Sequence, residues 1–364
     1  RRVAEVMRYG GGILAIYNED LIMESLEQYG YPHDEVWKFG NGGCWEVQIP
    51  GKTYFRYRSV DALNVLQAVT LKGYIEGTSF SSYEALYQQF VTDLRGPVEA
   101  IESETLRDFA LDSDGSTTDW RWLPTVPCTV VSLFEQGCIE RGLSYLEGGP
   151  VYNLVSAHIG GLPDVANSLY AIKKLVFDDK KVSFAELMTI LRNNWEGQEP
   201  LRQYALTKYV YFGNDNDEVD EIAAAIFEDF VDICDEMRGR TGYMTSAGVS
   251  TFGRQIAWAP ERSATPYGKK ANAVLANNFS PTPGTDREGA TAIIKSYCKS
   301  DLRRAVNGAA LDIKLLPMAV NGENGLEAIV ALIRGFVKLG GYFMQLDVAD
   351  AELLRAAQEH PEEY

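Results

Sequence analysis

The chain has 364 residues, of which 46% are hydrophobic and 23% charged, and a formal net charge of −17 at pH 7. These proportions are typical of a soluble globular protein with one large or two ordinary domains. The acidic balance excludes a nucleic-acid-binding surface, which needs clusters of Lys and Arg, and charges that interrupt the apolar stretches 222–230 and 325–339 exclude a membrane-spanning helix.

Helical signals dominate the chain, and most of them carry a recognisable start or stop. Asn18 and Gly30 are placed as N-cap and C-cap of the first long helix, and Ser81–Glu84 and Ser183–Glu186 are capping boxes. The predicted helices cover 19–29, a segment opened by Ser59 or Asp61 and ending at Lys72-Gly73, a long run after Ser82, 130–146, 164–177, 187–194, 218–238, 326–339 and 351–359.

Strand signals are short and lie between the helices. The predicted strands are 12–17, 47–49, 54–58, 243–251, 311–317 and 342–348. Strands that alternate with helices predict an α/β fold, either layered or closed into a barrel.

The segment Gly43-Cys44-Trp45-Glu46 is the strongest candidate for chemistry. In an extended chain the side chains of Cys44 and Glu46 point to the same side, with Trp45 on the other. A sulfur beside a proton acceptor suits a reaction in which one group activates a carbon and the other moves a proton. The alternative is a buried structural cysteine next to a surface glutamate.

The segment Tyr54-Phe55-Arg56-Tyr57-Arg58 follows directly and is a candidate substrate-binding strand. Its period of two places Tyr54, Arg56 and Arg58 on one side. Two arginines near a catalytic loop predict a clamp for a carboxylate or sulfonate. The alternative is that both arginines face solvent or pair with some of the 51 acidic residues.

The remaining cysteines and the histidines predict no metal site. Cys128, Cys138, Cys234 and Cys298 form neither a CxxC pair nor a Cys/His ligand spacing, and the three histidines are far apart. A disulfide framework is not expected in so large a chain, which indicates a reducing, cytoplasmic setting. His158 lies beside an apolar segment and is expected to be structural.

The chain resembles the glycyl radical enzymes of the pyruvate formate-lyase-like superfamily over nearly its whole length. The resemblance begins at Cys44-Trp45-Glu46 and Gln48-Ile49-Pro50-Gly51-Lys52-Thr53. The further matching segments, in the family's order, are Gly-Gly-Pro-Val-Tyr-Asn at 148–153, the segment 161–177 that begins Gly-Leu-Pro-Asp-Val-Ala-Asn, Phe-Gly-Asn-Asp-Asn-Asp at 212–217, Ala-Thr-Pro-Tyr-Gly-Lys-Lys at 264–270, Ser280-Pro281 through Ala292, and His-Pro-Glu-Glu-Tyr at 360–364.

The resemblance implies a fold and a reaction. The fold would be part of an α/β barrel, two half-sheets ringed by helices, with the cysteine loop in the lumen, and residues 1–364 would form one catalytic domain. Cys44 would become a thiyl radical that takes a hydrogen atom from a small-molecule substrate, and Glu46 would accept a proton. No cofactor would bind this chain directly. The glycyl radical would come from a radical-SAM activating enzyme, and the protein would be a homodimer that contacts neither nucleic acid nor membrane.

Two departures from the family pattern affect these expectations. Pyruvate formate-lyase has two adjacent cysteines where this chain has Gly43 and Cys44, so the Cys-x-Glu pattern resembles the dehydratase, decarboxylase and lyase branches. The diol dehydratases tend to carry an aspartate near the position of Arg58, and its absence favours an anionic substrate. The sequence ends at Tyr364, before the family's glycine loop, so we expect a fragment that lacks the N-terminal half and the radical glycine.

Three functions therefore remain in view. The first is a fragment of a glycyl radical lyase that cleaves a C–O, C–N, C–S or C–C bond. The second is acyl transfer of the pyruvate formate-lyase type. The third is a non-catalytic scaffold that pairs with another chain.

Overall fold

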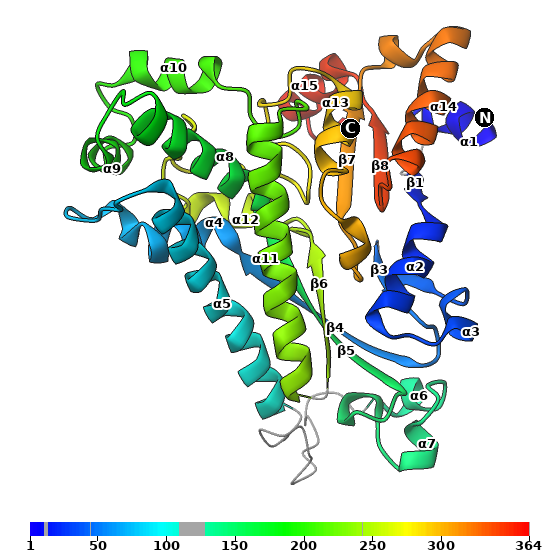
Figure 1. The fold of residues 1–364 in the computed structure, drawn as a ribbon. Coiled ribbons are helices and arrows are strands. Elements are labelled where there is room, and N and C mark those ends of the chain that lie inside the picture. The colour runs from blue at the N-terminus through cyan, green and yellow to red at the C-terminus, as the bar shows by residue number, and fades with distance from the viewer. Residues whose placement is uncertain (11–13, 44, 109–127, 242, 364) are drawn as a thin grey trace.

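Two three-stranded sheets form the centre of the molecule (Figure 1). The computed structural model describes residues 1–10, 14–43, 45–108, 128–241 and 243–363. One sheet has the order β4-β5-β6 and the other the order β1-β8-β7, while β2 and β3 form a separate hairpin. The strands are β1 Leu14–Tyr17, β2 Gly40–Gly42, β3 Glu46–Gln48, β4 Thr53–Asp61, β5 Tyr152–Gly160, β6 Met244–Val249, β7 Ala310–Leu315 and β8 Phe343–Val348.

Helices surround the sheets, and the α/β class predicted from the sequence is confirmed. Over the described residues, none of them combines the length and apolar character needed to cross a membrane. The α-helices are α1 Arg2–Met7, α2 Glu19–Tyr29, α3 His33–Val36, α4 Ala62–Asn64, α5 Tyr83–Asp108, α6 Thr129–Ser132, α7 Cys138–Arg141, α8 Leu162–Ile172, α9 Phe184–Arg192, α10 Glu199–Lys208, α11 Asp217–Thr241, α12 Arg254–Ala257, α13 Ala290–Tyr297, α14 Gly322–Lys338 and α15 Ala351–Glu359; π-helical turns at Val65–Thr70 and Lys173–Asp178 extend α4 and α8.

The capping signals account for the helix boundaries that the sequence predicts well. Gly30 ends α2 with a left-handed φ of 107°. The Ser183 hydroxyl accepts from the Glu186 amide at the start of α9, which completes the predicted capping box. Asp61, rather than Ser59, caps α4 by accepting from the amide of Asn64. These ends are set by local hydrogen bonds, which is why they can be predicted from sequence.

The first sheet is parallel, and its connections carry the long helices. The register places Tyr57 opposite Ser156, and Ser156 opposite Ser246. Parallel neighbours require crossover connections, which here contain α5 and α11. Both helices contact this sheet and each other, and they cross the front of the molecule in Figure 1. The two sheets meet at a parallel bridge between Val249 and Ala309.

Each strand of the first sheet presents one set of side chains to the hairpin and the opposite set to the helices. We call the side with Tyr57, Ser156, His158 and Ser246 the inner face, because Tyr57 and Trp45 of the hairpin turn both pack against Phe252 and Ser246 is linked to the hairpin through Asn307. The outer face carries Arg58, whose side chain reaches Glu104 of α5. Strand alternation fixes this division.

The sequence predictions differ from the structure in one helix, and they omit strand β5 and the helices α10 and α13. The helix expected over 130–146 is instead a series of short turns, α6, α7 and the 3₁₀ turn Tyr145–Glu147, because Gly137 and Gly142 adopt φ values of 99° and 66° that no α-helix accommodates. The central strand β5 was not predicted at all. Its alternate positions carry Ser156 and His158, which hide the apolar pattern of a buried strand.

Candidate active site

The predicted catalytic loop is the turn of the β2–β3 hairpin. Gly42 pairs with Glu46, so residues 43–45 connect the two strands. Gly43 has a φ of +84°, and a Cβ there would lie 2.6 Å from Oε2 of Glu46. Glycine is therefore required for this close approach of the carboxylate to the turn. Cys44 itself lies outside the described residues.

Glu46 is a buried carboxylate. Only 2% of its surface is exposed. The backbone amide of Trp45 donates to its Oε2 over 3.3 Å, which holds the side chain against the turn. A buried carboxylate held by a backbone donor next to a loop cysteine has the placement that a proton acceptor needs.

Trp45 anchors the loop between the two sheets. Its ring lies 5.5 Å from the ring of Phe252, which follows β6, and 5.7 Å from Phe343 of β8. Gly308 lies directly against it, since a Cβ at that position would be 2.7 Å from Cδ1 of the indole. The amide of Val47 donates to Oδ1 of Asn307 over 3.0 Å. These contacts fix the loop from the segments that precede β7 and follow β6.

The inner face of the first sheet carries Tyr57 and His158, and Arg254 of α12 lies against the tyrosine. The ring of Tyr57 lies 4.6 Å from that of His158, and the guanidinium of Arg254 lies 4.8 Å over the same tyrosine ring. Burial raises the pKa of Tyr57. The negative charge of Glu46 adds to this rise, whereas a hydrogen bond with Ser250 and the charge of Arg254 oppose it. The rings of Tyr57 and Trp45 each lie 5.5 Å from the ring of Phe252, so the tyrosine lies on the loop's side of the sheet.

His158 is completely buried and neutral. Burial, and then the positive charge of Arg254, lower its pKa from 6.5 to about 3. Both ring nitrogens lie within hydrogen-bond distance of serine hydroxyls, Nε2 at 2.8 Å from Ser156 and Nδ1 at 2.9 Å from Ser250. A histidine satisfied on both sides is a rigid polar element rather than a titrating group at neutral pH.

The three substrate-binding residues predicted from the sequence lie on the outer side of β4. Arg58 Nε is 3.5 Å from Oε2 of Glu104 on α5. Tyr54 is 4% exposed and its ring lies 5.0 Å from that of Tyr145. The charge of Arg56 acts on Tyr243, where it opposes the rise in pKa that burial causes. These three residues share one face of β4, and the anion clamp stays a prediction in which Arg58 would exchange Glu104 for the anion.

Sequence reasoning missed Tyr57 and Arg254. Tyr57 was in the predicted strand, but nothing in the sequence said which face of that strand is the inner one. Arg254 opens α12 far along the chain, and no spacing rule links it to Cys44. Only the parallel pairing of β4, β5 and β6 brings these positions to one side.

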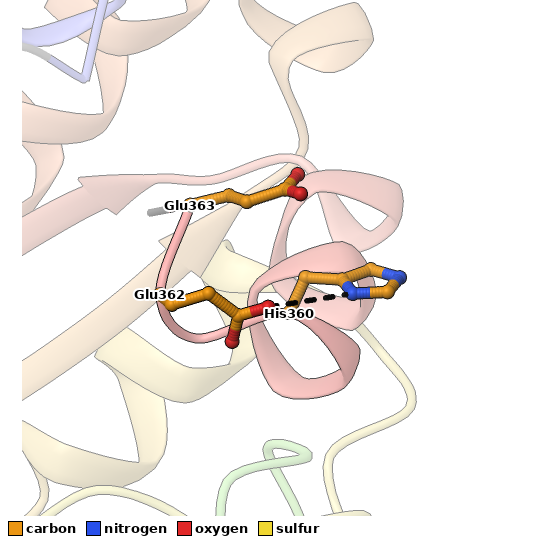
Figure 2. A group of neighbouring side chains, drawn as sticks. All are labelled: His360, Glu362 and Glu363. Carbon is orange, nitrogen blue, oxygen red and sulfur yellow. Dashed lines mark ion pairs between the residues drawn. The ribbon is translucent and has the colours of Figure 1, made fainter.

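A group of potential metal ligands lies elsewhere, at the end of α15. His360, Glu362 and Glu363 have ligand atoms within 4.8 Å of one another, and Nδ1 of His360 is 3.8 Å from Oε1 of Glu362 (Figure 2). All three are exposed. Surface acidic groups commonly lie this close without an ion, so we assign no metal to them.

Comparison with known families and structures agrees with this architecture. The family model described as pyruvate formate lyase-like matches residues 1–98 and 119–258, and the glycine radical model matches 275–364. The chain belongs to the pyruvate formate lyase-like family.

Individual relatives agree with the family. The chain is 28% identical to the trans-4-hydroxy-L-proline dehydratase of Clostridioides difficile, over 100% of this chain and 46% of the relative. It is also 28% identical to the isethionate sulfite-lyase of Nitratidesulfovibrio vulgaris, over 100% of this chain and 45% of the relative. The chain thus spans about half the length of the curated relatives it matches.

Solved structures confirm the fold. A Roseburia inulinivorans protein studied for 1,2-propanediol dehydration superposes with a TM-score of 0.88 and 31% identity, covering 100% of this chain and 47% of that one. The hydroxyproline dehydratase of C. difficile, with its substrate bound, superposes with a TM-score of 0.89 and 27% identity, covering 100% of this chain and 46% of that one. The predicted barrel fold of the glycyl radical enzymes is therefore confirmed.

Proposed function

We propose that this chain is part of a glycyl radical lyase that acts on a small substrate and cleaves a C–O, C–N, C–S or C–C bond. The observation that carries the proposal is the buried Glu46 carboxylate, held against the turn at Gly43 by the backbone amide of Trp45. The relatives named as dehydratases and sulfite-lyases support the same class of reaction.

The residues of this chain would divide the work. The Cys44 thiol would give its hydrogen atom to a glycyl radical, installed by a radical-SAM activating enzyme, forming a glycine C–H bond and leaving a thiyl radical. The Cys44 sulfur then takes a hydrogen atom from a substrate carbon, forming an S–H bond and leaving the carbon radical. Glu46 accepts a proton from a substrate hydroxyl or another acidic group, which makes that radical a better eliminating species. The loop, packed through Trp45 against both sheets, keeps water from the intermediate.

Arg254 supports an anionic substrate. It is a cation on the same side of the sheet as Glu46, and its charge acts on both Tyr57 and His158. A guanidinium there suits recognition of a carboxylate or sulfonate. The predicted clamp of Tyr54, Arg56 and Arg58 remains a separate proposal. Arg254 differs from it in that its charge acts on Tyr57 and His158.

Acyl transfer of the pyruvate formate-lyase type is the second candidate, and the scaffold is the third. Gly43 stands where the acyl-transfer enzyme has a second cysteine, so the covalent acyl relay lacks one of its two thiols. A scaffold gives no reason for a glutamate held in a buried position next to a glycine-constrained turn. We also propose that the working enzyme is a homodimer, as the family resemblance implies.

The decisive experiment uses the complete protein, activated anaerobically by its activating enzyme. We would supply isethionate and trans-4-hydroxy-L-proline as charged substrates, 1,2-propanediol and glycerol as neutral ones, and pyruvate with coenzyme A. The proposal expects an elimination or cleavage product from the first four compounds, with charged substrates preferred. Formate and acetyl-coenzyme A from pyruvate, with no product from the other four, would replace the proposal by the acyl-transfer function.

A further inference from the structure

A chain of buried hydrogen bonds runs from the catalytic loop into the first sheet. It begins at Asn307, which accepts the amide of Val47. The Asn307 side-chain amide donates to the hydroxyl of Ser246 over 3.3 Å. Ser246 donates in turn to the hydroxyl of Ser156 over 3.1 Å. All three of these side chains are completely buried.

The same chain continues through His158 and returns toward Glu46. Ser156 meets Nε2 of His158 at 2.8 Å, and Nδ1 meets Ser250 at 2.9 Å. Ser250 then donates to the hydroxyl oxygen of Tyr57 over 3.4 Å. Tyr57 is the group that the charge of Glu46 reaches. The rings of Tyr57 and of Trp45 in the loop both lie 5.5 Å from that of Phe252, so the route starts at the loop and returns to the same region.

The donors and acceptors give this chain a direction. Ser156 already accepts from Ser246, and its only hydrogen-bond acceptor within the described part of the chain is Nε2 of His158. Nε2 must then be the bare nitrogen and Nδ1 the protonated one, which donates to Ser250. The hydroxyl of Ser250 accepts from His158 and donates its own hydrogen bond to the oxygen of Tyr57.

The Tyr57 hydroxyl is consequently an acceptor toward Ser250 and keeps its own proton for another partner. The backbone carbonyl of Ser250 is one acceptor, but it lies at 3.5 Å, at the limit of a hydrogen bond. A substrate oxygen at an ordinary hydrogen-bond distance would be a better one. Arg254 over the ring adds positive potential at the same place.

We propose that Tyr57 is a substrate-contacting residue that donates a hydrogen bond to an oxygen of the substrate, and that His158 and Ser250 are positioning residues that orient this hydroxyl. The proposal rests on the lyase function proposed above and deepens it. It selects substrates with an oxygen acceptor, such as a hydroxyl, a carboxylate or a sulfonate, next to the carbon that loses hydrogen.

The binding test is a double-mutant cycle in the complete but unactivated enzyme. Dissociation constants for isethionate, trans-4-hydroxy-L-proline, 1,2-propanediol and glycerol would be measured by calorimetry for Tyr57→Phe, Ser250→Ala and the double variant. We expect Tyr57→Phe to weaken binding about tenfold and Ser250→Ala about threefold. Because Ser250 acts through the hydroxyl, the double variant should bind as Tyr57→Phe does.

A purely structural role predicts a different pattern. The two losses would then multiply, to about thirtyfold in the double variant, and that result would remove Ser250 from the positioning role. Wild-type binding by Tyr57→Phe would overturn the substrate contact itself. Tyr87→Phe is the matched control, because this half-buried tyrosine donates to Asp229 over 2.6 Å on the helices outside the sheet.

The direction of the chain has a test that needs no substrate. In protein labelled with ¹⁵N-histidine, the His158 signal, assigned by its loss in His158→Gln, should show the neutral Nδ1-protonated tautomer. An Nε2-protonated ring would overturn the positioning chain. If none of the four compounds binds the wild-type enzyme, the substrate contact and the proposed function both fail. The tautomer of His158 still shows whether the hydrogen-bond chain runs in the inferred direction.

Discussion

The two faces of strand β4 differ in a way that the sequence hides. The outer face carries Arg56 and Arg58, the charges that stand out in the sequence, and Arg58 finds its carboxylate partner on α5. The inner face carries Tyr57, a neutral residue, which lies beside His158 and Arg254 and packs against Phe252 together with Trp45 of the loop. The arginine clamp and the inner face are therefore two separate candidates for substrate binding, and variants on the two faces can tell them apart.

Parallel sheets make this ambiguity general. Both faces of such a sheet are covered, so no polar–apolar alternation shows which face is inside. In β5, Val155, Ala157 and Ile159 are as buried as Ser156 and His158. The difference between the faces lies in what covers them, and only the fold supplies that information.

The largest expected effect is a difference in kcat between variants of two carboxylates, Glu46 beside the loop and Glu104 on α5. Glu46→Gln in the activated complete enzyme should lower kcat by roughly 10²- to 10⁴-fold, because the proton acceptor is lost. Glu104→Gln, which removes the partner of Arg58 on α5, should change kcat less than about twofold. Steady-state kinetics of both variants measure this contrast, and equal activities would remove Glu46 from the mechanism.

The next prediction compares the two arginines. Arg254→Ala should raise KM for isethionate about tenfold or more and change KM for 1,2-propanediol little, because the lost interaction is with an anion. The clamp predicted from sequence requires the same pattern from Arg58→Ala. The KM values of both variants for both substrates show which face of the sheet binds the anion. An equal rise in KM for charged and neutral substrates would contradict the anion-binding role of the arginine concerned.

The buried histidine should affect stability in acid. His158 has its pKa lowered from 6.5 to about 3, mainly by burial. The unfolded chain takes up a proton here below about pH 6.5, whereas the folded chain does so only near pH 3, so stability is lost as the pH falls through this window. Thermal unfolding of His158→Gln should therefore show a shallower decline of Tm in that range. Parallel Tm curves would contradict the assignment.

The smallest effect concerns the anchor of the loop. Gly308 and Gly77 have similar φ values of +91° and +89°, but a Cβ at 308 meets Trp45 whereas one at 77 meets nothing within 4 Å. Alanine should cost about 1 kcal/mol at either position through the backbone. Gly308→Ala should cost about 1–3 kcal/mol more through the clash. Denaturant unfolding measures the difference, and equal losses would mean that Trp45 is not held there.

Much of the fold could be predicted because its signals are local. The caps at Gly30 and Ser183 involve neighbouring residues, and α15 ends where its pattern ends. Strand β5 and the turns of 129–147 could not be predicted, because a strand buried on both faces and a glycine-interrupted apolar run both lack a clear period. The loop from Gly43 to Glu46 was found from its spacing. Arg254 could not be, since its position depends on three strands pairing in parallel.

The most direct test of the account is the Cys44→Ala variant of the complete enzyme. After anaerobic activation, electron paramagnetic resonance should show the glycine radical at wild-type intensity, while no product forms from any substrate that the wild type converts. Cys138→Ala, which changes a buried cysteine of α7, should keep turnover. Product from Cys44→Ala at the wild-type rate would contradict the role of this sulfur as the hydrogen-atom carrier.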